Sequence, residues 1–315
     1  MTGADRHPAR AIALTGLLLA LIGLIVWAGL RTGHLEAAPA AAPSATPRET
    51  PPTTPTAVPT TDPAVPAGPA LVPSDPAVAA AFADRAAELG GRYALAWVDG
   101  DGLHVLGSVP EETAWSTMKV PLSIAAAARQ PTDQTWQLIE AAITRSDNDA
   151  AAVLWASLGP PEEAARAVDE VLDAYGSSGT RTESADVRPG FSSFGQSRWD
   201  LASQARFASA LACVPEPSAA GRVRAAMGRV IPDQRWGIGT LDEAHLKGGW
   251  GPDAAGAYVL RQLGDGQVDG KRYALALTAA SATGGHAHAA ADATALVRWW
   301  VQAVEPAGGL DCSRG

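Results

Sequence analysis

The order of strand and helix patterns along this 315-residue chain constrains its fold more than any other feature. Residues 93–98 and 103–106 have strand patterns and are separated by an Asp-Gly-Asp-Gly turn, so they predict a hairpin. Three further strands are predicted far downstream, at 243–249, 256–263 and 272–279. Strands at both ends with helices between them favour one antiparallel sheet, built from both halves of the chain, with a helical subdomain inserted.

Helical periodicity flanks and separates these strands. A helix at 76–89 ends at two glycines, which is a typical helix stop. A helix-rich stretch covers 116–175, an irregular loop follows at 176–198, and a shorter helix is predicted at about 200–212. Asp292 is expected to cap the last helix.

The N-terminal part of the chain lacks the pattern of a folded domain. Residues 11–30 are uncharged and almost wholly apolar, and such a run is long enough to cross a bilayer as a helix. With residues 1–10 as a cytoplasmic tail, this run predicts a single-pass anchor in the cell membrane with the rest of the chain outside; a cleaved signal peptide and a secreted protein are the alternative. Residues 31–75 are rich in Pro, Thr and Ala and predict a disordered stalk. The folded domain is therefore expected at 76–315.

Composition narrows the possible partners. The formal net charge of −9 argues against a nucleic-acid partner, because phosphate binding needs a basic surface. Cys213 and Cys312 lie too far apart for a zinc-type motif. In an exported protein such a pair favours a disulfide, and two free thiols are the alternative. His286 and His288 have no third ligand nearby in the sequence, so neither a metal nor another cofactor is expected.

Only three lysines occur among the 24 basic residues, and two of them lie in motifs that carry chemistry. Ser116 and Lys119 stand three positions apart at the start of a predicted helix, so they share one helix face. A neutral amine can activate a serine hydroxyl, and a lysine, unlike an arginine, can lose its proton in a suitable pocket. The alternative is a capping serine beside a surface lysine.

Two further motifs supply the polar groups that such a site needs. Ser146 and Asn148 belong to a Ser-Asp-Asn run ahead of an apolar helix, where they can relay a proton and hold a substrate carbonyl, or simply cap the helix. Lys247 opens the run Lys-Gly-Gly-Trp-Gly on a predicted strand. Its amine can pair with a substrate carboxylate, and the glycines allow a substrate to approach the strand edge; a strand that ends in a glycine turn is the alternative.

The three motifs occur in order on a predicted helix, loop and strand. In this the region 76–310 resembles the penicillin-recognising serine enzymes, above all class A β-lactamases and related transpeptidases, whose signature is S-x-x-K, S-D-N and K-T-G. The resemblance implies an α/β (α+β) fold with a five-stranded antiparallel sheet flanked by terminal helices. An all-helical domain would lie beside the sheet, with the active site between the two. Only 30 residues separate Ser116 from Ser146, so the helical domain is expected to be shortened.

Carried over motif by motif, the resemblance implies a role for each residue. Ser116 would be the nucleophile, Lys119 its general base and Ser146 the proton relay. The substrate would be held by Asn148, Lys247 and Gly249, and the backbone N–H groups of Ser116 and Trp250 would form the oxyanion hole.

Two departures from the family pattern bear on substrate and turnover. Gly248 replaces the hydroxyl residue of the third motif, so one hydrogen bond to a substrate carboxylate is missing. The E-x-x-L-N-like run that carries the deacylating glutamate of class A β-lactamases is absent between Tyr175 and Trp199, where Glu183 and Asp186 are the acids in reach. Without such a base, the acyl-enzyme is expected to persist.

Together these features predict a monomeric extracytoplasmic serine hydrolase. It would form an acyl-enzyme on Ser116 with β-lactam, D-alanyl-peptide or ester substrates. Its partners would be a small molecule or a peptidoglycan stem peptide, and the membrane through residues 11–30. The alternative is a non-catalytic module of the same fold that binds cell-wall peptide or a protein partner.

Overall fold

The computed structural model describes a single compact unit of the chain, Thr61–Gly315, in which residues 68–253, 256–282, 285–304 and 308–313 are placed. The predicted tail, anchor and most of the predicted stalk lie outside these residues. Within the described part of the chain, no helix has the length and apolar character needed to span a membrane.

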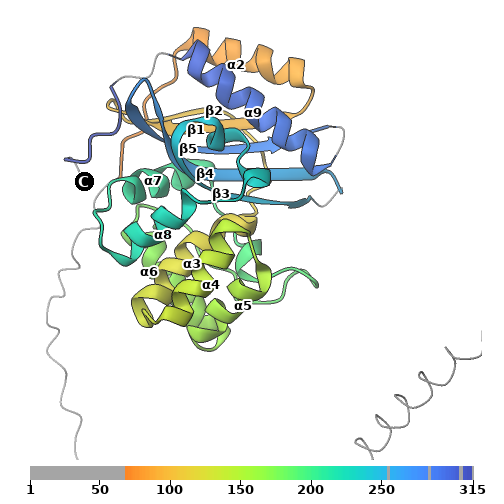
Figure 1. The fold of residues 1–315 in the computed structure, drawn as a ribbon. Helices are drawn as coiled ribbons and strands as arrows, with labels where there is room; N and C mark the ends of the chain where they lie inside the picture. The colour runs from red at the N-terminus through yellow and green to blue at the C-terminus, as the bar shows by residue number, and fades with distance from the viewer. Residues whose placement is uncertain (1–67, 254–255, 283–284, 305–307, 314–315) are drawn as a thin grey trace, which may run out of the picture. The chain divides into compact units, whose positions relative to one another are not determined.

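A five-stranded sheet organises the fold, in the order β2-β1-β5-β4-β3 with all neighbouring pairs antiparallel (Figure 1). β1 of the N-terminal hairpin pairs with β5 of the C-terminal half, which confirms that both halves of the chain build one sheet. β3 lies at an edge of the sheet. The strands are β1 (Arg92–Val98), β2 (Leu103–Gly107), β3 (Asp242–Pro252), β4 (Tyr258–Val268) and β5 (Lys271–Ala280).

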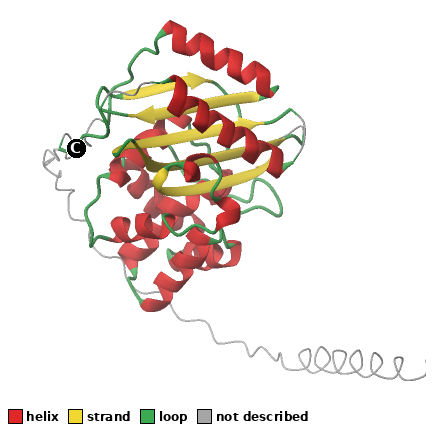
Figure 2. Ribbon diagram, turned by 45° about the horizontal axis from the view of Figure 1, so that its top comes forward, coloured by secondary structure: helices red, strands yellow, loops and turns green. Residues whose placement is uncertain are grey.

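The two faces of the sheet have different neighbours, because side chains alternate along each strand. The terminal helices α2 (Pro76–Leu89) and α9 (His286–Ala303) lie on one face, and α7 (Leu201–Ala212) lies on the other (Figures 1 and 2). In the middle of β5, Leu275 and Leu277 belong to the hydrophobic cluster of α2 and α9. Ala274 and Ala276 belong to the cluster of the remaining helices. The small alanines leave room for α7 to pack directly on the strands.

The remaining helices gather beside the sheet, as the resemblance implied (Figure 1). The helix-rich stretch consists of a 3-10 turn, η1, followed by four helices: η1 (Trp115–Met118), α3 (Lys119–Arg129), α4 (Asp133–Thr144), α5 (Asn148–Ser157) and α6 (Pro161–Ala174). The predicted irregular loop at 176–198 holds only a short 3-10 turn, η2 (Phe194–Gln196). A further helix, α8 (Ala219–Met227), had no prediction from the sequence.

The start of the last helix differs from the sequence prediction. α9 begins at His286, so Asp292 lies inside the helix and does not cap it. The Asp292 carboxylate instead accepts a hydrogen bond of 2.8 Å from the Tyr93 hydroxyl of β1. Aspartate is a common helix-capping residue, but here the buried Tyr93 hydroxyl, far away in the sequence, is the hydrogen-bond partner of Asp292.

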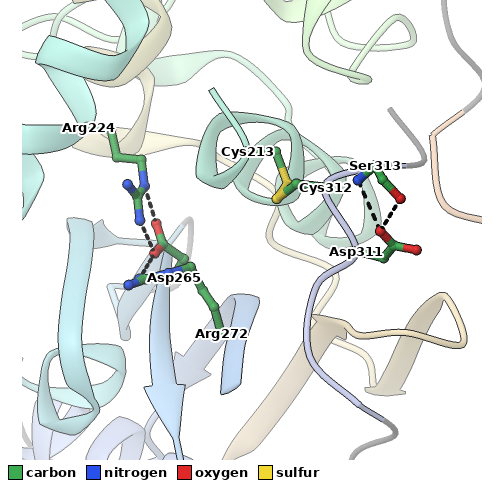
Figure 3. The surroundings of a disulfide bond; sticks show 7 residues. All are labelled: Cys213, Arg224, Asp265, Arg272, Asp311, Cys312 and Ser313. Carbon is green, nitrogen blue, oxygen red and sulfur yellow. Dashed lines mark hydrogen bonds and ion pairs between the residues drawn. A yellow bond between two sulfur atoms is a disulfide. The ribbon is translucent and has the colours of Figure 1, made fainter. Parts of the chain in front are cut away.

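A buried ion pair fixes α8 against the sheet (Figure 3). The Asp265 carboxylate of β4 accepts hydrogen bonds from Arg224 Nε and Nη2 of α8, at 2.9 and 2.6 Å, and another from Arg272. Burial alone would raise the pKa of Asp265, but hydrogen bonds from His245 and Arg224 lower it, so the carboxylate stays ionised. The network therefore holds α8 beside β3 and β4.

The predicted disulfide between Cys213 and Cys312 is present, with the two Cα atoms 5.2 Å apart (Figure 3). It joins the end of α7 to the C-terminal segment across a sequence separation of 99 residues. A crosslink that closes so long a loop restricts the unfolded chain strongly.

Replacing both cysteines with serine is expected to lower the free energy of unfolding by about 3–5 kcal/mol, because the unfolded chain regains the entropy of the open loop. Urea denaturation of the oxidised protein and of the double variant, followed by circular dichroism, measures the difference. Equal midpoints and slopes for the two proteins would contradict this expectation.

Candidate active site

The turn that carries Ser116 packs closely against the edge strand β3. A Cβ atom on Gly249 would lie only 2.6 Å from the backbone nitrogen of Ser116, and one on Gly251 would overlap the Trp115 ring. Only glycine permits this approach of strand to turn. The two glycines of the third motif thus place the Ser116 N–H group at the free edge of the sheet.

The residue before Ser116 is held in a strained conformation. Trp115 has a φ of +53°, a value that is rare for a bulky residue and costs energy. Its buried ring is held by the loop residues Phe191, at 5.5 Å between ring centroids, and Arg188, at 5.5 Å from its guanidinium. Ser116 itself is half-buried, and its hydroxyl makes no hydrogen bond with any described residue. That hydroxyl is therefore free to meet a ligand.

The Lys119 side chain turns from its helix into the second motif. Its amine donates to the backbone oxygen of Ser146 at 2.6 Å, to Ser146 Oγ at 3.3 Å and to Asn148 Oδ1 at 2.6 Å. Burial lowers the pKa of Lys119 to about 8, against a smaller opposing effect from Asp147. At neutral pH a small but useful fraction of this amine is unprotonated and can act as a base.

The third motif contributes a second amine to the same serine. Lys247 Nζ donates to Ser146 Oγ at 2.9 Å and to the backbone oxygen of Gly248 at 2.7 Å. Its side chain is fully buried, and this burial, followed by the nearby charge of Lys119, holds the pKa of Lys247 well below its usual value. Lys119, Ser146 and Lys247 form what we call the lysine–serine cluster.

Ser146 is oriented by the loop between α4 and α5. Its φ of +58° lies in the left-handed region, and Asp147 caps α5 by accepting a hydrogen bond of 2.9 Å from the Ala150 N–H group. Two amines donate to Ser146 Oγ, so its own hydroxyl proton is available for a third partner. Ser146 is half-buried and Asn148 is exposed, so a ligand that enters from solvent can reach the Ser146 hydroxyl and accept its proton.

The two candidate loop acids do not reach the lysine–serine cluster. Glu183 Oε1 accepts a hydrogen bond of 2.8 Å from the N–H group of Ala185, within its own loop, and Asp186 is exposed. Neither carboxylate has a hydrogen bond or ion pair with Ser116 or with the cluster in the described part of the chain. The arrangement thus offers a free hydroxyl and two buried amines, and no carboxylate of the described residues is hydrogen-bonded to them.

Sequence reasoning missed one charged residue that supports the site. Arg261 of β4 is fully buried and donates to the backbone oxygens of Glu112 at 2.6 Å and Thr113 at 3.5 Å, in the segment just before η1. Burial lowers the pKa of Arg261 to about 10, although nearby acids, Glu112 first, oppose this. The sequence held no signal for this role, because the strand pattern does not show which arginine turns inward.

A second missed residue lies beside Gly248. The ring of Trp236, which is 8% exposed, fills the space where a side chain at position 248 would project. His286, one of the two histidines noted in the sequence, contacts the rings of Trp236 and Trp250, at centroid distances of 6.0 and 4.6 Å. No group of His, Cys, Asp or Glu side chains among the described residues is arranged to hold a metal.

Solved structures of class A β-lactamases share this fold. An ancestral class A β-lactamase matches with 17% identity and a TM-score of 0.52, over 72% of this chain and 100% of that one. A β-lactamase from Burkholderia vietnamiensis matches with 18% identity and a TM-score of 0.54, over 73% and 99%. The putative class A β-lactamase PenP from Rhodopseudomonas palustris matches with 15% identity and a TM-score of 0.52, over 72% and 100%.

These matches establish the fold predicted from the motifs, the β-lactamase/transpeptidase-like architecture. The chain matches no protein-family model and no curated protein. At identities of this level the shared fold says nothing about the reaction, so the chemistry has to be argued from the residues of the site.

Proposed function

We propose that this chain is a serine hydrolase that forms an acyl-enzyme on Ser116 with amide or ester donors, among them β-lactams and D-alanyl peptides. The lysine–serine cluster is the observation that carries this proposal. Residues from three distant motifs meet there through hydrogen bonds of 2.6 to 3.3 Å, and the Ser116 hydroxyl makes no hydrogen bond with the described residues. Two buried amines with lowered pKa values are costly for stability, which favours a chemical role for them.

In the proposed acylation, Ser116 Oγ attacks the carbonyl carbon and a carbon–oxygen bond forms. The Oγ proton passes to the neutral amine of Lys119, and the N–H groups of Ser116 and Trp250 stabilise the oxyanion. When the bond to the leaving nitrogen or oxygen breaks, Ser146 donates its proton to that atom. Lys119 then restores the Ser146 proton through their 3.3 Å contact.

In the proposed deacylation, water attacks the Ser116 ester, the acid leaves and the serine hydroxyl is restored. Among the described residues, no carboxylate is hydrogen-bonded to the lysine–serine cluster. Asp147 caps α5, Glu183 accepts a hydrogen bond within its own loop, and Asp186 is exposed. We therefore expect slow deacylation and a long-lived acyl-enzyme.

Acylation should accelerate as the pH rises through about 8, because the neutral fraction of the Lys119 amine increases there. The initial rate of acyl-enzyme formation with phenyl phenylacetate, measured by quenching and intact mass from about pH 6 to about pH 10, tests this. The Ser116→Ala variant corrects for acylation of other nucleophiles on the protein. A rate that stays constant or falls across this range would rule out a neutral amine as the base.

The proposal is tested by exposing the protein to three reagents: a fluorophosphonate, phenyl phenylacetate and benzylpenicillin. All react with activated serines, but only benzylpenicillin carries a carboxylate. A stoichiometric mass increase with at least one reagent, absent from Ser116→Ala, supports the enzyme. If a folded protein gains no mass with any of the three, the non-catalytic binding module is the correct description.

We propose that this activity is located outside the cytoplasm. The disulfide between Cys213 and Cys312 fits an oxidising compartment, and the apolar run at 11–30 supports export as an anchor or a signal peptide. Fractionation of expressing cells, with protease added to intact spheroplasts, tests it: digestion of the domain only after lysis would contradict export.

A further inference from the structure

The strand position beside Lys247 has no space for a polar side chain. A Cβ atom on Gly248 would lie 2.8 Å from Cζ2 and 3.0 Å from Cη2 of Trp236. The Trp236 segment is fixed, because its backbone oxygen accepts a hydrogen bond of 2.8 Å from the Gln262 side chain of β4. An indole ring thus occupies the place from which a hydroxyl could contact a substrate anion.

The Lys247 amine is a poor partner for a substrate carboxylate in this setting. It is fully buried, and it already donates to Ser146 Oγ and to the Gly248 oxygen. Its lowered pKa also favours the neutral amine. A carboxylate would have to displace these internal hydrogen bonds and lose its hydration in a buried site, which is unfavourable.

Aromatic rings border the strand edge on the side of Gly248. We call Trp236, Trp250, Tyr258 and His286 the aromatic cluster. The His286 ring lies 4.6 Å from Trp250, 6.0 Å from Trp236 and 6.3 Å from Tyr258. Trp250, Tyr258 and His286 are half-buried, so the cluster is open to solvent next to the proposed oxyanion hole.

The aromatic cluster carries little positive charge to attract an anion. Burial lowers the pKa of His286, so its imidazole is neutral at physiological pH. Trp236 Nε1 and His286 Nε2 are buried without a hydrogen-bond partner among the described residues. The nearby guanidinium of Arg188 donates to the Pro252 oxygen at 2.8 Å and stacks on Phe191 at 4.5 Å, on the Trp115 side of the strand.

Resting on the proposed function, we propose that the aromatic cluster is a subsite for an uncharged, apolar or aromatic group beside the scissile bond. The enzyme then prefers neutral esters and amides over donors that carry a carboxylate at that position. This preference follows from the filled space at Gly248, the buried Lys247 amine and the open aromatic surface around Trp250.

The matched test compares benzylpenicillin with its methyl ester, which differ only at one group, a charged carboxylate in the first and a neutral methyl ester in the second. In both, Ser116 Oγ bonds to the lactam carbonyl carbon, the carbon–nitrogen bond breaks and the nitrogen takes the proton. We expect the second-order rate of mass gain at Ser116 to be at least about tenfold higher with the methyl ester. An equal or higher rate with the free acid would overturn the subsite and leave the proposed function intact.

Two variants separate the subsite from general effects on the protein. Trp250→Ala keeps the backbone N–H group, and we expect it to lower the ratio of the methyl ester rate to the benzylpenicillin rate by about tenfold. Trp299→Ala removes another half-buried tryptophan, which packs on Phe82 at 5.5 Å, and should leave the ratio of the two rates unchanged. Equal slowing of both reagents in Trp250→Ala would contradict the subsite.

The labelling results distinguish failure of the subsite from failure of the proposed function. If a fluorophosphonate labels Ser116 but neither penicillin derivative does, the subsite is wrong and the reactive serine stands. If no reagent labels Ser116, the proposed function fails first, and the subsite with it.

The double variant Trp236→Leu with Gly248→Thr opens the space and adds a hydroxyl. We expect it to shift the rate ratio towards the free acid by about tenfold or more, because it supplies a hydrogen bond to a charged group.

Discussion

The Ser116→Ala variant is expected to gain no mass from any acyl donor or fluorophosphonate, whereas the unmodified protein is labelled to near stoichiometry. The substitution removes only the hydroxyl group of Ser116. Because this hydroxyl makes no hydrogen bond with the described residues, the variant should keep the fold. The backbone N–H group that faces the edge strand remains in place. Intact-protein mass spectrometry after incubation with phenyl phenylacetate measures the effect directly.

Ser123→Ala is the matched control for this variant. Ser123 lies on α3, is completely buried, and its hydroxyl has no hydrogen-bond partner among the described residues. Its removal should leave labelling unchanged and should not lower the melting temperature, since an unsatisfied buried hydroxyl is lost. Full labelling of Ser116→Ala would mean that another group is the nucleophile.

The second large effect is expected from Lys119→Met, which keeps an unbranched side chain as far as Cε and removes the amine. We expect the acylation rate to fall by about 10²–10⁴, the usual contribution of a positioned general base. The rise of the rate with pH should disappear with it, because the titrating group is absent. Stopped-flow or quenched measurements with phenyl phenylacetate, at several pH values, give both the rate and its pH dependence.

Lys271→Met controls for the loss of a lysine, since Lys271 is exposed at the start of β5 and should not affect the rate. Lys119→Met also leaves the Ser146 oxygen and Asn148 Oδ1 without their donor. Circular dichroism and a melting curve therefore have to show that the variant folds. A folded Lys119→Met protein that acylates at the original rate would exclude the amine as base.

Much of the architecture could be predicted because it depends on local patterns. The turn after β1, the strand patterns and the order of the three motifs can all be recognised in short stretches of sequence. The structure confirms the predicted sheet and the predicted disulfide. The failures involve contacts between distant residues. Asp292 has the chemistry of a helix cap, but the Tyr93 hydroxyl holds it inside α9. Nothing near Asp292 in the sequence reports that partner.

The candidate site shows the same division. The sequence identified Lys119, Ser146 and Lys247, and the structure brings their side chains together. It did not predict that both amines would meet at Ser146 and leave the Ser116 hydroxyl unbound. Trp236 and Arg261 were also missed, because a residue that fills space beside a glycine or turns under a backbone segment carries no local signature. Their positions depend on packing of whole elements.

The location of the acyl group tests the central claim most directly. The protein is incubated with phenyl phenylacetate, quenched in acid, digested, and the modified peptide is sequenced by tandem mass spectrometry. We predict a phenylacetyl group on Ser116 and none on Ser146, although Ser146 is the hydroxyl that contacts both amines. A phenylacetyl group on Ser146, or the absence of any acylated serine in the folded protein, would contradict the account.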